Sequence, residues 1–287
     1  MASLKEIKVR IASIRNTQKI TSAMKMVSSA KLHHTQTVME NMLIYQQKLS
    51  HLLQELLTTD DPVDSPFTVQ REIRKVAIVA FSSNSGLCGP FNANVWKTLH
   101  TNMQQLEREH ISVLLYPVGK KIADNLRKEG YQINEQFIQT GDKLSYEATS
   151  RLADELIGLF RNCEVDRVDL LFHHFKNRAE QIITRETFLP VTLPEQKPDS
   201  DETSDYIIEP SSEQLTDLLL PKVLHINIYA KLLDNLTAEY ASRMLAMQTA
   251  DDNANDLIQE LTLQFNKTRQ QAITNELLDI MGGKSQK

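Results

Sequence analysis

A glycine-rich stretch that contains a cysteine, residues 82–97 (SSNSGLCGPFNANVWK), is the part of the sequence with the strongest suggestion of chemistry. It follows an apolar run and precedes a helical pattern, which is where many folds bind phosphate at a helix N-terminus. A P-loop must end in Gly-Lys-Ser/Thr, but Gly89 is followed by Pro90, and a dinucleotide fingerprint needs three spaced glycines where only Gly86 and Gly89 exist. We therefore interpret the stretch as a structural or partner-contacting turn, with nucleotide binding as the alternative.

The thiol of Cys88 lies in this turn, close to the start of the expected helix. A helix N-terminus can lower a thiol pKa, but no histidine stands nearby to act as a base, so an inert small residue is the favoured interpretation. The other cysteine is Cys163, and two cysteines in a chain of this length indicate a reducing compartment rather than a disulfide framework.

Metal chemistry has few candidates. They are two adjacent histidine pairs and one acidic row: His33-His34, His173-His174, and Asp252, Asp256 and Glu260. Neighbouring side chains point about 100° apart on a helix and to opposite faces of a strand, so neither pair is suited to chelate one ion. The acidic row has the i, i+4 spacing of a helix face but no histidine to complete a helical di-metal site. We predict no metal, no cofactor and no catalytic residue in this chain.

Charge is distributed unevenly over the 287 residues, whose formal net charge is −5. Residues 1–33 carry seven Lys/Arg and one acid, whereas residues 231–281 carry four Lys/Arg and eight acids. This asymmetry can orient the chain within an assembly, but the acidic total and the absence of aromatic residues before Tyr45 disfavour nucleic-acid binding. No apolar run reaches the ~18 residues of a membrane span, and the basic N-terminus lacks a signal-peptide core, so we expect a mature bacterial cytoplasmic segment.

Proline and glycine divide the chain into three parts. All nine prolines lie between Pro62 and Pro221, six of the eight glycines lie between Gly86 and Gly158, and the other two are the pair at 282–283. Since proline costs a helix interior about 3 kcal/mol and glycine about 1, the two breaker-free regions are predicted to be long helices. The expected division is a helix in 1–61, a central α/β domain in 62–221 and a helix in 222–287.

Both terminal regions carry a seam with alternating steps of three and four residues, which is typical of a coiled coil. In the first helix the seam runs Leu4, Ile7, Ile11, Ile14, Gln18, Thr21, Lys25, Ser28, Leu32, Thr35, Met39, Met42, Gln46, Leu49, Leu53, Leu56. In the second it runs Tyr229, Leu233, Leu236, Tyr240, Arg243, Met247, Ala250, Ala254, Leu257, Leu261. An antiparallel pair is the simplest way to join the first and last helices of one chain.

The first seam becomes polar within residues 16–32, where Gln18, Lys25 and Ser28 occupy it. Apolar residues recur beside it at Ile20, Ala23, Met24 and Val27, so we hypothesise that the seam shifts onto these residues. In that hypothesis the helices approach closely and present Met24 and Lys25 outward.

The central region changes to strand-like periods. Five strands are predicted at 75–81, 111–118, 131–138, 167–175 and 179–190, with helices at 92–109, 120–129 and 146–162. Strand–helix alternation predicts a mostly parallel, doubly wound sheet, ending in a hairpin at 176–178. Residues 193–212 are polar, contain proline and are predicted to form an exposed loop.

Three segments closely resemble the gamma subunit family of the rotary (F-type) ATP synthase. They are IRNTQKITSAMKMVSSAKL near the start, SGLCGPFN in the centre, and ASRMLAMQTADDNAN with FNKTRQQAITNELLDIMGG at the end. The resemblance covers nearly the whole chain and implies terminal helices in an antiparallel coiled coil with a Rossmann-like α/β foot between them. It also implies a non-catalytic rotor that couples ion-driven rotation of a membrane ring to the catalytic beta subunits.

The resemblance further implies specific partners and contacts. The partners are the alpha and beta subunits, the epsilon subunit and the membrane c-ring, with one copy of this chain per complex, peripheral on the cytoplasmic side of the bacterial plasma membrane. By motif position, the sleeve contacts carry over to Met24, Lys25, Arg243, Met247, Gln248, Arg269, Gln270 and Thr274, and residues 204–210 resemble the region that meets epsilon and the ring. The foot turn is defined by Gly86, Cys88 and Gly89. Two alternatives remain from the residues alone: a Rossmann-type nucleotide-binding enzyme with helical extensions, and a coiled-coil adaptor.

Overall fold

The computed structural model describes residues 3–58, 66–142, 144–191 and 212–283. Contacts divide the chain into two compact units. Unit 1 joins Met1–Ala30 with Arg243–Lys287, and unit 2 is Lys31–Ser242. The first helix, α1 (Leu4–Thr58), and the last, α5 (Ser212–Gly283), each contribute to both units.

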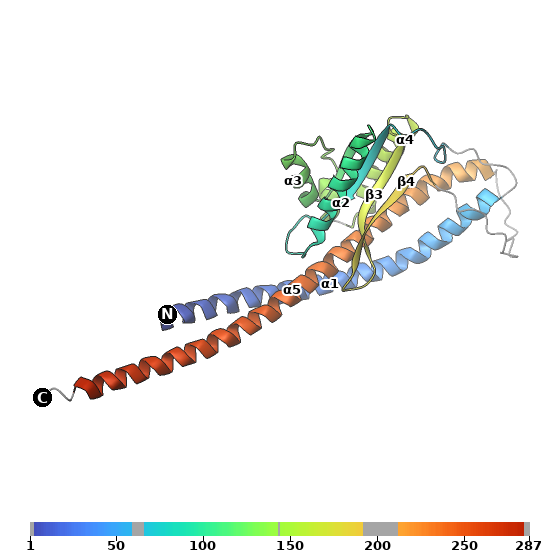
Figure 1. Cartoon of the computed structure of the whole chain (residues 1–287). Helices are drawn as coiled ribbons and strands as arrows, with labels where there is room; N and C mark the ends of the chain where they lie inside the picture. Colours follow the sequence, from blue (N-terminus) through green and yellow to red (C-terminus); the bar gives the residue numbers. More distant parts are fainter. Residues whose placement is uncertain (1–2, 59–65, 143, 192–211, 284–287) are drawn as a thin grey trace. The chain divides into compact units, whose positions relative to one another are not determined.

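A four-stranded sheet organises unit 2 (Figure 1). The strands are β1 (Lys75–Phe81), β2 (Ser112–Val118), β3 (Arg167–Phe175) and β4 (Gln181–Leu189), in the spatial order β2-β1-β3-β4. β1 pairs in parallel with β2 and with β3, whereas β4 returns antiparallel to β3. The predicted doubly wound α/β class and the closing hairpin are confirmed.

Helices cover both faces of this sheet. On one face α2 (Phe91–Arg108) and α3 (Lys120–Lys128) pack on Val76, Ile78 and Ala80 of β1. On the other face α4 (Tyr146–Arg161) and the first part of α5 pack on the alternate β1 residues. This alternation is the period-2 rule of a strand that is buried on both sides.

The predicted strand at 131–138 is wrong. Gly130, with φ of +81°, follows α3, and the only pairing of the next segment with the sheet is a single bridge between Ile133 and Leu115. The side chain of Asn134 accepts a hydrogen bond from the backbone N–H of Gln136 at 3.0 Å, which turns the chain away from the β2 edge. A 3₁₀ helix at Ile138–Asp142 follows instead of a strand.

The last helix begins earlier than predicted. The prolines placed its start at residue 222, but α5 begins at Ser212 and contains Pro221. Proline costs a helix interior about 3 kcal/mol, and the flanking Leu220 and Leu224 are each 2% exposed within the unit 2 core. Burial of this face offsets the loss of one helical hydrogen bond. The predicted loop at 193–212 lies almost wholly outside the described residues.

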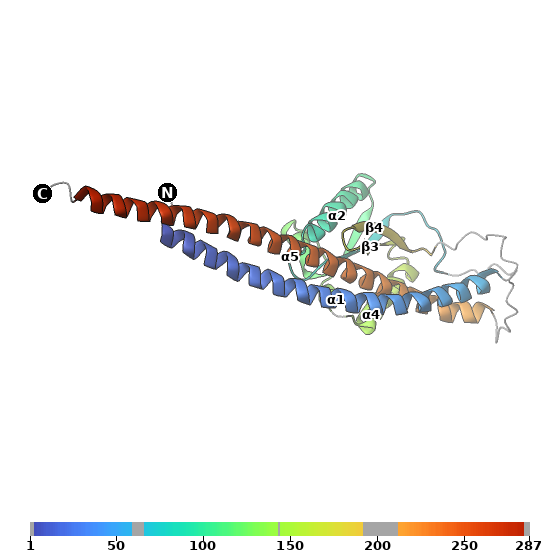
Figure 2. The same cartoon turned by 90° about the horizontal axis from the view of Figure 1, so that it is seen from below.

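Unit 1 is an antiparallel pair of helical segments (Figure 2). Every predicted seam position from Leu4 to Ser28 is buried or half-buried, including the polar ones. The hypothesis of a seam shift is therefore wrong, because Ile20 is 61% exposed, Val27 is 56% exposed and Ala23 is also exposed, and of the four residues only Met24 is half-buried. Polar side chains, not their apolar neighbours, occupy the helix–helix contact.

On α5 the predicted seam holds up to Ala254 and then changes by one residue. Leu257 is 44% exposed, whereas the next residue, Ile258, is half-buried. Leu261 returns to the seam and is 8% exposed. A step of four from Ala254 to Ile258 followed by three to Leu261 has the same seven-residue sum, so the repeat alone could not distinguish the two orders.

Candidate interaction surface

The Gly-rich turn after β1 is held by a compact set of hydrogen bonds. The hydroxyl of Ser83 donates to the carbonyl of Ser85 at 2.6 Å and accepts from Nδ2 of Asn92 at 2.7 Å. The same Nδ2 lies 3.1 Å from Sγ of Cys88. These contacts close the turn onto the start of α2, so its polar groups are used for its own structure.

Cys88 joins the turn to α5. The thiol is 2% exposed, and the carbonyl of Cys88 accepts a hydrogen bond from Oγ of Ser242 at 2.7 Å. Phe91 and Ala238 bury the same spot. A buried thiol in such an apolar cluster is packed rather than reactive, which fits the prediction of an inert Cys88.

The tip of the turn is strained and apolar. Leu87 has φ of +62°, a conformation unusual for a branched residue, and its side chain is 64% exposed. Gly89 has φ of +58° and lies in the same left-handed region, which glycine adopts without the steric cost that a Cβ imposes. Gly86 lies in open space, since a Cβ there would meet no atom within 4 Å.

Side-chain contacts attach the end of β3 to α5. The carboxylate of Asp234 accepts from the backbone N–H of Phe175 at 2.8 Å, and its other oxygen lies 2.7 Å from Nδ1 of His174. His173 points to the opposite face, where it stacks on Phe91 with ring centroids 4.0 Å apart. Burial lowers the pKa of His173 to about 4. The two histidines therefore cannot share one metal ion, and in the part of the chain that the structure describes no group of three metal-binding side chains occurs.

The polar seam of unit 1 contains two contacts between the helices. Nε2 of Gln18 donates to Oδ1 of Asn255 at 2.6 Å, and Nζ of Lys25 lies 3.4 Å from Oδ2 of Asp251. The seam-shift hypothesis placed Lys25 outward, but its side chain instead pairs with α5. The sequence analysis did not predict Asp251 and Asn255 as contacts between the helices, because it considered only the acidic row at 252, 256 and 260. Their position could have indicated the contact, since each directly follows a seam alanine, Ala250 or Ala254.

The predicted sleeve contacts fall into three groups by exposure. Arg243 and Met247 are 7% and 4% exposed, Met24, Lys25 and Gln248 are half-buried, and Arg269, Gln270 and Thr274 are exposed. The amide of Gln248 donates to the carboxylate of Asp252 on its own helix at 2.9 Å. The structure thus brings the first two groups to the seam or its margin, and leaves only the last three fully accessible.

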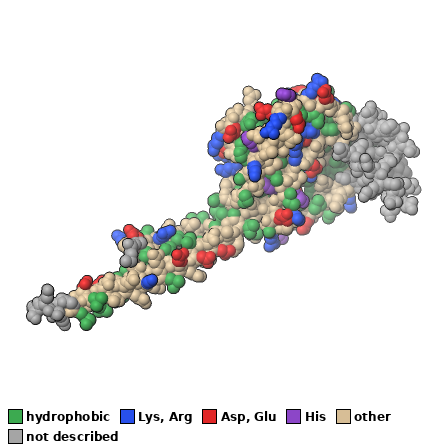
Figure 3. Space-filling model, in the orientation of Figure 1, with side chains coloured by type: hydrophobic (Ala, Val, Ile, Leu, Met, Phe, Trp, Pro, Cys, Tyr) green, Lys and Arg blue, Asp and Glu red, His purple; other side chains and the backbone are tan. Residues whose placement is uncertain are grey.

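Exposed apolar side chains recur along unit 1 (Figure 3). On α1 they are Val9, Ile20, Met26 and Val27, and on α5 they are Leu245, Leu257, Leu263, Ile273, Leu277, Leu278, Ile280 and Met281. From residue 273 to 281 every side chain of α5 is exposed. Such a long apolar exposure marks a surface for protein partners.

The fold and this surface define a class: a mixed α/β protein that pairs its first and last helices and presents apolar side chains along them. Comparison with known proteins gives the family. A family model described as ATP synthase matches residues 3–285. The ATP synthase gamma chain of Parabacteroides distasonis is 59% identical over 283 residues, which cover 99% of this chain and 98% of the relative. That of Phocaeicola vulgatus is 50% identical over 286 residues, 99% of each.

The fold agrees with the same family. A chain in the cryo-EM structure of the Euglena gracilis mitochondrial ATP synthase OSCP/F1/c-ring superposes with a TM-score of 0.62 at 19% identity, covering 98% of this chain and 93% of that one. The chain belongs to the ATP synthase gamma chain family. Its function is that of the gamma subunit of ATP synthase, a non-catalytic subunit of the complex, and the enzyme and adaptor alternatives are set aside. The described helices include none long and apolar enough to cross a membrane.

Proposed function

We propose that unit 1 turns inside a sleeve of alternating alpha and beta subunits and drives each catalytic beta site through its open and closed states. The observation that carries this is the run of exposed apolar side chains on both helices of unit 1, in a chain of the gamma family. A surface of this kind needs a partner along its length. Rigid-body rotation of an asymmetric shaft would then gate the sites conformationally.

The proposed sleeve contacts are Met24, Lys25, Arg243, Met247, Gln248, Arg269, Gln270 and Thr274. The exposure of each side chain determines how readily it can contact the sleeve. Arg269, Gln270 and Thr274 are exposed on the part of α5 nearest its C-terminal end and can meet the sleeve without rearrangement. Lys25 already pairs with Asp251, and Met247 is buried, so any contact through these two uses the edge of the side chain only.

The other partners follow from the same family. We infer that the foot, with its turn at Gly86, Cys88 and Gly89, lies toward the epsilon subunit and the membrane c-ring. The exposed Leu87 at the tip supports a partner contact there. The proposal includes one copy per complex, a peripheral position on the cytoplasmic side of a bacterial plasma membrane, and a division into shaft helix 1–61, foot 62–221 and shaft helix 222–287.

The test is the double variant Arg269→Ala/Gln270→Ala in ATP synthase reconstituted into vesicles. Both side chains are exposed and make no side-chain bond within the described residues, so folding should be unchanged while the sleeve contact is lost. We expect proton pumping per ATP hydrolysed to fall severalfold. The matched control is Gln104→Ala/Arg108→Ala, an exposed pair on α2. Unchanged coupling in the test variant would remove these residues from the proposed contact.

A further inference from the structure

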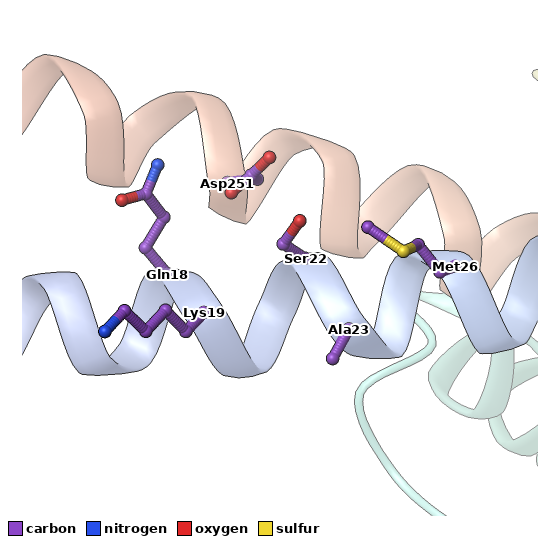
Figure 4. Close-up of a pocket in the computed structure, with 6 residues that line it drawn as sticks. All are labelled: Gln18, Lys19, Ser22, Ala23, Met26 and Asp251. Atoms are coloured by element: carbon purple, nitrogen blue, oxygen red, sulfur yellow. The ribbon is translucent and has the colours of Figure 1, made fainter.

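The two polar contacts of the unit 1 seam are the basis of a further inference. Gln18 bonds to Asn255 and Lys25 pairs with Asp251, so residue numbers rise on one helix as they fall on the other. Gln18 and Asp251 point into the space between the helices and line a groove of about 380 Å³ (Figure 4). The Lys25 and Asp251 side chains are only 27% and 13% exposed, so this is a partly desolvated ion pair.

An apolar seam does not by itself fix how far one helix is advanced along the other. Apolar seam positions recur every seven residues, so their spacing alone does not exclude a slip of α5 by one heptad. The charged pair behaves differently. Residues seven before and seven after Asp251 are Met244 and Ile258, so either slip would leave the ammonium of Lys25 half-buried against an apolar side chain.

The amide pair discriminates less. Residues seven before and seven after Asn255 are Gln248 and Thr262, and both can accept a hydrogen bond from the amide of Gln18. We propose that the Lys25–Asp251 pair is the register key of unit 1: positioning residues that set the axial position of α5 against α1. A polar group at one seam position specifies register in this way at some cost in stability.

The consequence concerns the exposed end of α5. A one-heptad slip changes the position of the unit 1 part of α5 relative to α1 by about 10 Å, at about 1.5 Å per residue. All side chains of segment 273–281 are exposed, so none of the described residues buries this end of α5. The register key therefore determines how far this segment reaches, and with it the level of Arg269, Gln270 and Thr274 relative to contacts on α1.

The direct test uses pulsed electron paramagnetic resonance to measure the distance between spin labels at Val9 and Leu263 in the full-length chain. Both positions are exposed, at 63% and 73%, and Cys163 is replaced by serine to avoid stray labelling. We expect one narrow distance in the parent chain. In Lys25→Met/Asp251→Met we expect a second distance population, because one heptad moves Leu263 along the helix axis by about 10 Å relative to Val9.

Matched variants isolate the pair. Lys19→Met/Asp256→Met removes the same charges from exposed positions on the same helices and should keep the single distance. The exchange Lys25→Asp/Asp251→Lys should restore it, whereas Lys25→Asp alone, with two facing carboxylates, should not. If methionines perturb folding, Lys25→Gln/Asp251→Asn removes charge at nearly constant shape. A single unchanged distance in either neutralised pair would overturn the register key.

A functional arm follows, and it rests on the proposed rotor function. In reconstituted ATP synthase, slipped registers should lower proton pumping per ATP. A second distance population with normal coupling would keep the register key and count against the proposed sleeve contacts. Normal coupling with one distance would reject the key alone, so the two failures can be told apart.

Discussion

The sheet of unit 2 and the helix pair of unit 1 are specified by different physics. In unit 2 the residues that meet across layers are apolar and almost fully buried, such as Leu152, Leu156 and Phe160 of α4 at 0% exposed. In unit 1 the contact includes an amide pair and an ion pair, and the most buried apolar side chains, Ile7 and Met247, keep a few per cent of exposure.

The difference matters for what each region can do. A close-packed apolar interior resists displacement, because any gap loses contacts that nothing replaces. A narrow two-helix seam buries less and leaves most of each helix in contact with other surroundings. Unit 2 is thus suited to a rigid mount, and unit 1 to a slender element whose partners lie outside the chain and whose register depends on few contacts.

The largest expected effect tests this contrast with the same substitution in each region. Leu156→Ala should cost about 2–5 kcal/mol, because the surrounding layers cannot collapse into the cavity. Leu261→Ala, at a two-helix seam that can relax around the smaller side chain, should cost about 2 kcal/mol, the lost burial of the side chain alone. Native-state hydrogen exchange, recorded separately for the amides of the sheet and of the helix pair, measures both. Equal losses would break the comparison.

Sequence periodicity captured the elements whose faces are unambiguous. The strands β1 and β3, the three foot helices and the α1 seam from Leu4 to Ser28 all follow from spacing, since burial on one face imposes period 2 or 3.6. The Gly-rich turn was also located, because its glycines lie where strand and helix must connect.

Context decided what spacing could not. The segment 131–138 alternates like a strand, but an Asx turn at Asn134 diverts it after one bridge. Pro221 was taken as a boundary, yet packing of its neighbours carries the helix through it. The polar seam was expected to shift, because sequence alone shows an unfavourable residue at Lys25 but not that Asp251 faces it.

An intermediate effect should appear in unit 2 as the pH falls. Burial lowers the pKa of His173 to about 4, against an ordinary 6.5, and Nδ1 of its ring is buried without a hydrogen-bond partner. Between these values the unfolded chain binds the proton and the folded chain does not, so the free energy of unfolding decreases on acidification. Above pH 6.5 the effect is absent, and below about 4 it is complete.

The measurement compares parent and His173→Phe in urea at pH 7 and pH 5. The parent should lose about 2 kcal/mol more than the variant over this interval, as linkage with these two pKa values requires. Phenylalanine can keep the stacking on Phe91, whose ring centroid lies 4.0 Å away. A parent and a variant with the same pH dependence would show that His173 is solvated in solution, and the view of unit 2 as a dry interior would need revision.

The smallest expected effect tests the hydrogen bond that attaches the turn of unit 2 to α5. The hydroxyl of Ser242 donates to the carbonyl of Cys88 at 2.7 Å, at the end of unit 2 and directly before Arg243 begins unit 1. Ser242→Ala should weaken this attachment by about 1 kcal/mol, the usual net contribution of one hydrogen bond.

The rate at which a thiol reagent labels Cys88 measures this loss, because Cys88 is buried and reacts only when the turn opens locally. We expect labelling of Cys88 to become about fivefold faster, while the exposed Cys163 of the same molecule keeps its rate and serves as the internal control. Equal acceleration at both cysteines would indicate that the whole chain is destabilised. An unchanged rate at Cys88 would show that contacts with Phe91 and Asn92, and not the bond to α5, keep the turn closed.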